Sequence, residues 1–125
     1  MKKGFTLLEM TVVMAIMGIL ASAAIGAYLA SQQKGRDAQR KSDLEQLQRA
    51  LEAYVGDHGV YPAAVTSRIG SCGGSYDGAC SWGGEFKDIN GTVYMKQLPK
   101  DPSQQVYVYV TSTNRREYQL FAILE

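Results

Sequence analysis

Hydrophobic and polar positions divide the chain into an uncharged first part and a mixed second part. No charged residue occurs from Met10 to Ser31, whereas the stretch from Gln32 to Pro62 carries five basic and five acidic side chains. About 20 apolar residues in a helix span a bilayer, and the 25 residues from Phe5 to Leu29 are therefore long enough. The pattern predicts one membrane-spanning helix that continues into a water-exposed segment.

The helical period persists after the apolar stretch. Apolar side chains recur at i, i+3, i+7, i+10 and i+11, which is one face of an α-helix: Leu44, Leu47, Leu51, Tyr54 and Val55. Glu45 and Arg49 form an (i, i+4) pair of the kind that is typical of a solvated helix face. We expect a single helix from about Phe5 to Val55, ended by the glycines at 56 and 59 and by Pro62.

The remaining residues predict a small head. The segment from Ala63 to Gly91 is rich in Gly and Ser and has little periodicity, so we expect an irregular loop over the helix. Two segments near the end, Val106–Val110 and Tyr118–Leu124, predict strands joined by a hairpin at Ser112–Arg116. Thr92–Met95 is a possible third strand.

Alternation along the first of these strands predicts its orientation. It places the valines at 106, 108 and 110 toward the helix, with Tyr107 and Tyr109 on the opposite face. The expected fold class is α+β: a long N-terminal helix packed on a two- to three-stranded antiparallel sheet.

Charge and reactive groups exclude several functions. Lys and Arg total 13 against 12 for Asp and Glu, and a net charge of +1 creates no field that would recruit nucleic acid. His58, the one histidine, lies at the expected helix end without a nucleophile or second base placed by spacing. The glycines from 70 to 84 lack the Lys-Ser/Thr ending of a phosphate loop. We expect no enzyme, no catalytic residues and no cofactor.

Cys72 and Cys80 lie inside the Gly-rich segment. Closing their nine-residue loop as a disulfide would stabilise the head by roughly 2.6 kcal/mol on the chain-entropy model, and an oxidising envelope permits it. Two free thiols are an alternative. A metal site is another, although a C-x7-C pair without a second pair lacks zinc spacing.

Glu9 is out of place in the hydrophobic segment. A carboxylate there costs a few kcal/mol and usually has a partner or a function. If the leader is removed after Gly4, the new α-amine of Phe5 lies one helical turn from Glu9. In a bundle of identical helices, Glu9 of one copy can then pair with that amine on the next, which would fix an axial stagger.

These residues resemble a known family. Gly4-Phe5-Thr6-Leu7-Leu8-Glu9-Met10-Thr11-Val12-Val13, after a Lys-rich leader, is similar to the class III signal of type IV prepilins and of the related pseudopilins of type II secretion and competence systems. The resemblance implies that an inner-membrane aspartic prepilin peptidase cleaves after Gly4 and N-methylates Phe5. It also implies that Glu9 is needed for filament assembly.

The resemblance sets the expected organisation. Residues 1–4 are a leader peptide, 5–30 a transmembrane and polymerisation helix, 31–58 an amphipathic helix half, and 59–125 a globular head. The expected partners are further copies in a helical filament, the prepilin peptidase and an inner-membrane assembly platform. The chain is expected first as a single-pass inner-membrane precursor and then in an extracellular pilus.

Three functions follow from this family. The leading hypothesis is a structural pilin of a type IV pilus that serves adhesion, twitching motility or DNA uptake. The first alternative is a pseudopilin of a type II secretion or competence system. The second is a DNA-binding minor pilin, indicated only by Arg68, Arg115 and Arg116.

Calcium bears on the choice between pilin and pseudopilin. The resemblance implies that major pseudopilins of type II secretion bind calcium in an acidic C-terminal loop. The corresponding hairpin here carries Arg115 and Arg116. We therefore expect no metal site and favour a pilus.

Two other interpretations of the hydrophobic segment stay open. An ordinary secretory signal would be cleaved after Ala21-Ser22-Ala23, before Ala24. A plain one-pass anchor would remain uncleaved.

Overall fold

A computed structural model describes residues 4–72 and 78–125. The basic part of the expected leader, residues 1–3, and two glycines of the expected loop, at 73 and 74, lie outside these residues. The chain forms two compact units, one up to Gly35 and one from Arg36 to Glu125, and each is described by itself.

The helix α1 runs from Leu7 to His58, which confirms the single long helix that the sequence predicts. Its end lies three residues beyond the expected Val55. Gly59 adopts a φ of +72°, and its N–H donates to the Val55 carbonyl oxygen at 2.7 Å. A left-handed residue at this position is the usual glycine cap, since glycine has no Cβ to oppose it.

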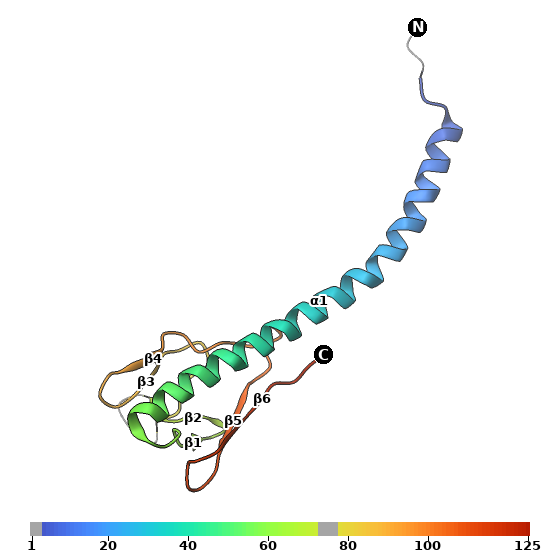
Figure 1. The fold of residues 1–125 in the computed structure, drawn as a ribbon. Helices are drawn as coiled ribbons and strands as arrows, with labels where there is room; N and C mark the ends of the chain where they lie inside the picture. Colours follow the sequence, from blue (N-terminus) through green and yellow to red (C-terminus); the bar gives the residue numbers. More distant parts are fainter. Residues whose placement is uncertain (1–3, 73–77) are drawn as a thin grey trace. The chain divides into compact units, whose positions relative to one another are not determined.

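The core of the second unit forms where the apolar stripe of α1 meets the head. Leu47, Leu51 and Tyr54 are at most 1% exposed. They belong to one cluster with residues from four later segments: Ile69, Phe86, Leu98 and Tyr109. Figure 1 shows the green part of α1 beside β2 (Arg68–Ile69), β3 (Phe86–Lys87) and β5 (Val108–Thr111), the strands that supply Ile69, Phe86 and Tyr109. The predicted stripe therefore is the buried face of the helix.

The strands form three antiparallel pairs rather than the one sheet that the sequence predicts. The pairs are β1 (Ala64–Val65) with β2 (Arg68–Ile69), β3 (Phe86–Lys87) with β4 (Val93–Met95), and β5 (Val108–Thr111) with β6 (Tyr118–Phe121). The last pair is the expected hairpin, and β4 is the possible third strand.

The expectation of an irregular loop from Ala63 to Gly91 is wrong in part, because β1, β2 and β3 lie within it. The turn between β1 and β2 holds Thr66 and Ser67 at φ values of 48° and 60°. Tight hairpin turns of this geometry usually carry Asn-Gly or a similar pair. The Thr-Ser pair gave no such signal, so the pattern missed the hairpin.

The predicted orientation of the first strand segment is also wrong. Tyr107 and Tyr109 are at most 1% exposed, whereas Val106 is 54% and Val110 is 43% exposed. The Tyr107 hydroxyl donates to Asp43 Oδ2 at 2.7 Å, and the Tyr109 hydroxyl donates to the Pro62 carbonyl oxygen at 2.7 Å. A tyrosine buries more apolar area than a valine once its hydroxyl has a partner, so the tyrosines face inward.

A substitution at Tyr107 tests this orientation. Tyr107→Phe removes the hydrogen bond to the buried carboxylate of Asp43, and hydrogen bonds to charged groups contribute about 1.5–3 kcal/mol. We expect the free energy of unfolding to fall by about that amount, measured by near-ultraviolet circular dichroism in urea on the chain in detergent micelles. Tyr28→Phe, at a side chain that is 63% exposed, is the matched control. Equal stability of the two variants would contradict the inward orientation of Tyr107.

Candidate functional site

The first turn of α1 is closed by a reciprocal pair of hydrogen-bonding side chains. Thr6 directly precedes the helix, and its hydroxyl oxygen accepts a hydrogen bond from the Glu9 N–H at 3.2 Å. The Glu9 carboxylate, through Oε2, accepts from the Thr6 N–H and from the Thr6 hydroxyl, both at 2.9 Å. This arrangement is a capping box, in which an N-cap threonine and a glutamate three residues later satisfy each other's backbone N–H groups.

The capping box gives Glu9 a partner within its own chain. The partner expected from the sequence is the new α-amine of Phe5 on another copy. The structure adds Thr6, whose spacing of three from Glu9 is the sequence signature of a capping box. A carboxylate in the first turn also lies at the positive end of the helix dipole. The local cost of carrying this acid in the apolar segment is thereby reduced.

The predicted cleavage residues lie just before this cap. Phe5 is 77% exposed. A Cβ built on Gly4 would meet no atom of the described residues within 4 Å, so packing against these residues does not require glycine there.

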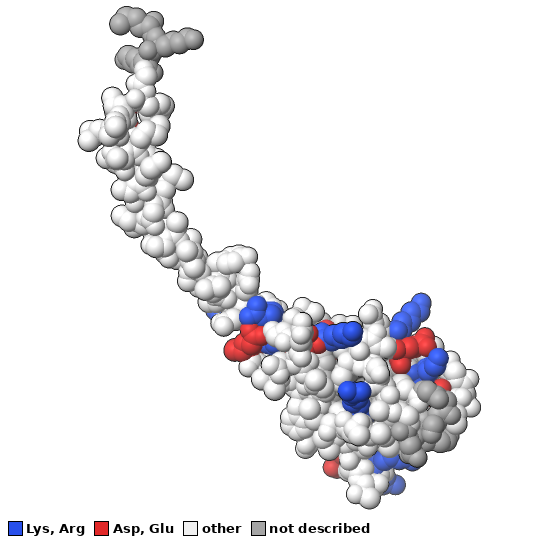
Figure 2. All heavy atoms as spheres, turned by 180° about the vertical axis from the view of Figure 1, so that it is seen from behind, with Lys and Arg blue, Asp and Glu red and all other residues white. Residues whose placement is uncertain are grey.

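Apolar side chains cover the unit that ends at Gly35, and they are exposed. Leu7 is 84% and Ile19 is 70% exposed, and Leu29 at the far end is 57% exposed. Figure 2 shows most of this part of the helix as a white surface, in agreement with the absence of charged residues from Met10 to Ser31. In α1 the described residues contain one segment long and apolar enough to cross a membrane. A surface of this size requires lipid or protein around it.

Two polar side chains in this unit bond to the helix itself. The Thr11 hydroxyl donates to the Leu7 carbonyl oxygen at 3.0 Å, and the Ser22 hydroxyl donates to the Ile19 carbonyl oxygen at 2.8 Å. A hydroxyl that donates to a carbonyl oxygen of the preceding turn has a hydrogen-bond partner even where water is absent. These side chains therefore need no external partner in a membrane.

Cys72 and Cys80 form a disulfide, with Cα atoms 5.0 Å apart. This confirms the leading expectation for the pair and excludes the two alternatives, free thiols and a metal site, in this structure. Both cysteines are buried, at 8% and 1% exposure. The bond ties the segment after β2 to the segment before β3, in a region with little regular structure.

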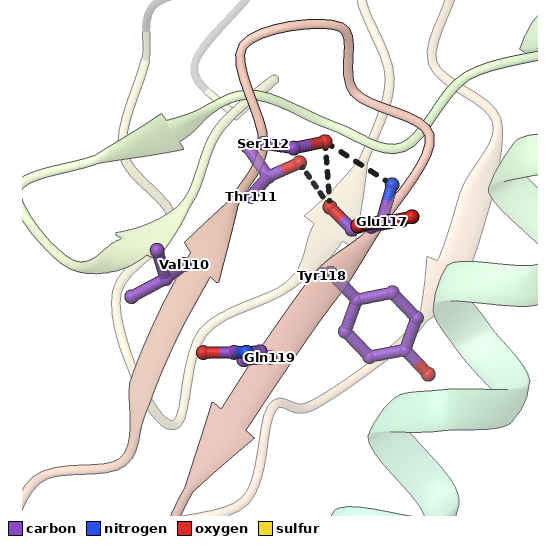
Figure 3. Close-up of a pocket in the computed structure, with 6 residues that line it drawn as sticks. All are labelled: Val110, Thr111, Ser112, Glu117, Tyr118 and Gln119. Carbon is purple, nitrogen blue, oxygen red and sulfur yellow. Dashed lines mark hydrogen bonds between the residues drawn. The ribbon is translucent and has the colours of Figure 1, made fainter.

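The hairpin between β5 and β6 does not fit calcium. Its carboxylate is Glu117, and its neighbours in sequence are Arg115 and Arg116. Calcium takes six to eight oxygen ligands, several of them carboxylates. Figure 3 shows that the hydroxyls of Thr111 and Ser112 instead donate to the Glu117 carbonyl oxygen, at 3.0 and 3.3 Å. The oxygen atoms here hold the hairpin together, and residues 4–72 and 78–125 contain no group of three His, Cys, Asp or Glu side chains placed so that they could hold a metal ion.

His58 has a structural role at the end of α1. Its ring stacks on Tyr54 with centroids 4.2 Å apart, and Nε2 lies 3.1 Å from Asp88 Oδ2. The Tyr94 hydroxyl donates to Asp57 at 2.9 Å in the same cluster, and burial raises the pKa of this phenol. The cluster joins the helix end to β4 and carries no nucleophile.

Comparison with known proteins agrees with the N-terminal geometry. Residues 1–25 match the family model of the prokaryotic N-terminal methylation motif. The type II secretion system core protein G of Vibrio cholerae is 32% identical over 96% of this chain and 78% of its own length. The protein of the same name from Escherichia coli is 32% identical over 97% of this chain and 80% of its own length. The one from Pseudomonas aeruginosa is 26% identical over 98% of this chain and 82% of its own length. No solved structure matches the chain.

The long helix, the small antiparallel head and the methylation motif define a class: this is a pilin-like protein with a class III prepilin signal. Within that class, the chain belongs to the family of type II secretion system core protein G. These relatives are named as core proteins of a secretion system and not as enzymes. The apolar helix and the prepilin signal indicate an inner-membrane precursor.

The capping box predicts a local effect of Thr6→Ala. Loss of an N-cap threonine costs typically about 1 kcal/mol, so amide hydrogen exchange in the first turn of α1 is expected to become several-fold faster. The measurement is nuclear magnetic resonance of the chain in micelles. Thr11→Ala is the control, because that hydroxyl bonds to carbonyl oxygens and not to the cap. Equal protection of the first turn in both variants would refute the cap.

Proposed function

We propose that the chain is a pseudopilin, a structural subunit of a filament that serves type II secretion. The observation that carries this proposal is the similarity to core protein G along nearly the whole chain, including the head. The methylation motif alone is shared by pilins and pseudopilins and supports only the broader class. The first alternative drawn from the sequence is thus better supported than the leading pilus hypothesis.

The proposed assembly step exchanges one partner of Glu9 for another. In the single chain the carboxylate is held by Thr6. Cleavage by a prepilin peptidase after Gly4 would create a cationic α-amine at Phe5, which N-methylation leaves cationic. On an inner-membrane assembly platform, this amine of one copy would pair with Glu9 of the next. An ion pair in an apolar surrounding has few competing partners, so it can select one stagger between copies.

The proposal assigns a task to each segment. Residues 1–4 are the leader, residues 5–30 leave the membrane and form the filament core, residues 31–58 carry the charged face, and residues 59–125 form the surface of the filament. The exposed apolar side chains of the first unit support this division, since neighbouring helices would cover them in place of lipid.

A type IV pilin is the second candidate, because one observation favours it. The β5–β6 hairpin has Arg115 and Arg116 where the resemblance implies an acidic calcium loop in major pseudopilins. Cells that lack the chain distinguish the two: loss of secreted proteins with surface fibres intact supports the pseudopilin. Loss of surface fibres with normal secretion supports the pilin.

The mature N-terminus is the first test of processing. Mass spectrometry of the chain purified from membranes is expected to find N-methylated Phe5. Cleavage before Ala24 would mean a secretory signal, and an uncleaved chain would mean a plain anchor. Gly4→Ala is expected to block processing, whereas Gly18→Ala, also in open space, is the control and should be processed normally.

Glu9→Gln tests the assembly step. The variant keeps the shape of the side chain and removes the charge that would pair with the amine. We expect membrane insertion to be unchanged and filament yield to fall at least tenfold, which corresponds to about 1.4 kcal/mol. Filaments sheared from cells and quantified by immunoblot give the measurement. Glu45→Gln, at an exposed position of the charged face, is the matched control. Normal filament yield from Glu9→Gln would contradict the pairing.

A further inference from the structure

An arginine with no exposed surface lies at the centre of an acidic cluster in the second unit. The side chain of Arg40 is 0% exposed, and that of Asp101 is 1% exposed. Nε of Arg40 donates to Asp101 Oδ1 at 2.6 Å, and one terminal nitrogen donates to Asp101 Oδ2 at 3.2 Å. The remaining contacts are to Asp37 Oδ1 at 2.6 Å and Glu125 Oε1 at 2.9 Å. One guanidinium group therefore serves three carboxylates.

These carboxylates belong to three separate segments of the unit. Asp37 lies on α1, three residues before Arg40. Asp101 holds the turn that precedes β5, because its Oδ2 accepts from the N–H groups of Ser103 at 2.8 Å and Gln105 at 3.2 Å. Glu125 follows β6, and Arg36 and the Ser103 hydroxyl also donate to it. Arg40 thus connects the helix with segments on both sides of the β5–β6 pair.

Hydrogen bonds stabilise the ionised form of two carboxylates in the cluster, Asp101 and Glu125. The Arg40 hydrogen bonds lower the pKa of Asp101. The Arg36 guanidinium, together with Ser103 and Arg40, lowers the pKa of Glu125 to about 2. Carboxylates held in this way are acceptors for a cation at every physiological pH, and Arg40 is the cation that occupies them.

We infer that the Arg40 guanidinium supplies the positive charge that holds these three carboxylates together, and that the unit Arg36–Glu125 folds without calcium. Two observations support this inference. The β5–β6 hairpin offers one carboxylate and two arginines, which do not fit calcium. The described cluster that does gather three carboxylates already contains a guanidinium, whose rigid fork of donors suits several carboxylates at once. The inference concerns the folding of this unit and does not depend on whether the filament is a pilus or a pseudopilus.

The test compares thermal unfolding with calcium and with a chelator. The full chain in detergent micelles is followed by near-ultraviolet circular dichroism, which reports the aromatic core of the head. We expect the wild-type Tm to be the same in millimolar calcium and in excess chelator. A wild-type Tm that falls on chelation, or rises with calcium, would overturn the inference.

Two variants separate the role of Arg40 from that of any helix arginine. Arg40→Ala leaves Asp101 buried without its counter-charge, so a Tm lower by more than about 10 °C is expected for a unit of this size. Arg49→Ala, at an exposed position of the same helix, is the control and should change the Tm little. Equal stability of the two variants would overturn the inference.

Discussion

The exposed apolar surface of residues 7–29 is the constraint on which the rest of this protein depends. A soluble protein buries such side chains, and here the chain itself covers few of them. Water is therefore excluded as their final environment, and the remaining choices are lipid and other protein chains. A carboxylate at the start of such a surface has to be compatible with both. The capping box meets this requirement, since Thr6 holds Glu9 when no second copy is present. A proposed change of partner at Glu9 would then accompany transfer from lipid to filament.

The second unit differs from the first, because its interior is rich in polar groups that have hydrogen-bond partners. Tyr109 on β5 and Tyr107 just before it face inward, where the sequence predicted valines, and burial raises the pKa of both phenols. Arg40 and Asp101 are buried as well, and each satisfies the other. A small head has little apolar area to bury, so hydrogen-bonded aromatic rings, a disulfide and one multiply bonded arginine contribute a large part of its order. Each of these groups is costly if its partner is removed, which explains why single substitutions are expected to have large effects here.

The sequence predicted those features that a local pattern encodes. The period of apolar residues defined α1 and its buried stripe, Gly59 marked its end, and alternation located the β5–β6 hairpin. The cysteine spacing suggested the disulfide. The features it missed depend on contacts between distant residues: which face of β5 turns inward was decided by Asp43 and Pro62, which lie 64 and 47 residues away. The role of Arg40 could not be predicted for the same reason, since its partners Asp101 and Glu125 are 61 and 85 residues away in the sequence. The capping box was local, and Thr6-x-x-Glu9 could have revealed it.

The arginine cluster also changes how the hairpin bears on function. The two arginines and single carboxylate between β5 and β6 favoured a pilus, on the assumption that a pseudopilin head needs calcium. If Arg40 provides the positive charge that links α1, the turn at Asp101 and the segment after β6, then the head has no need of a metal ion in that hairpin. The hairpin sequence then carries no information about the machine in which the chain works. What remains is the similarity to core protein G along nearly the whole chain, and this supports the proposed pseudopilin over a pilin.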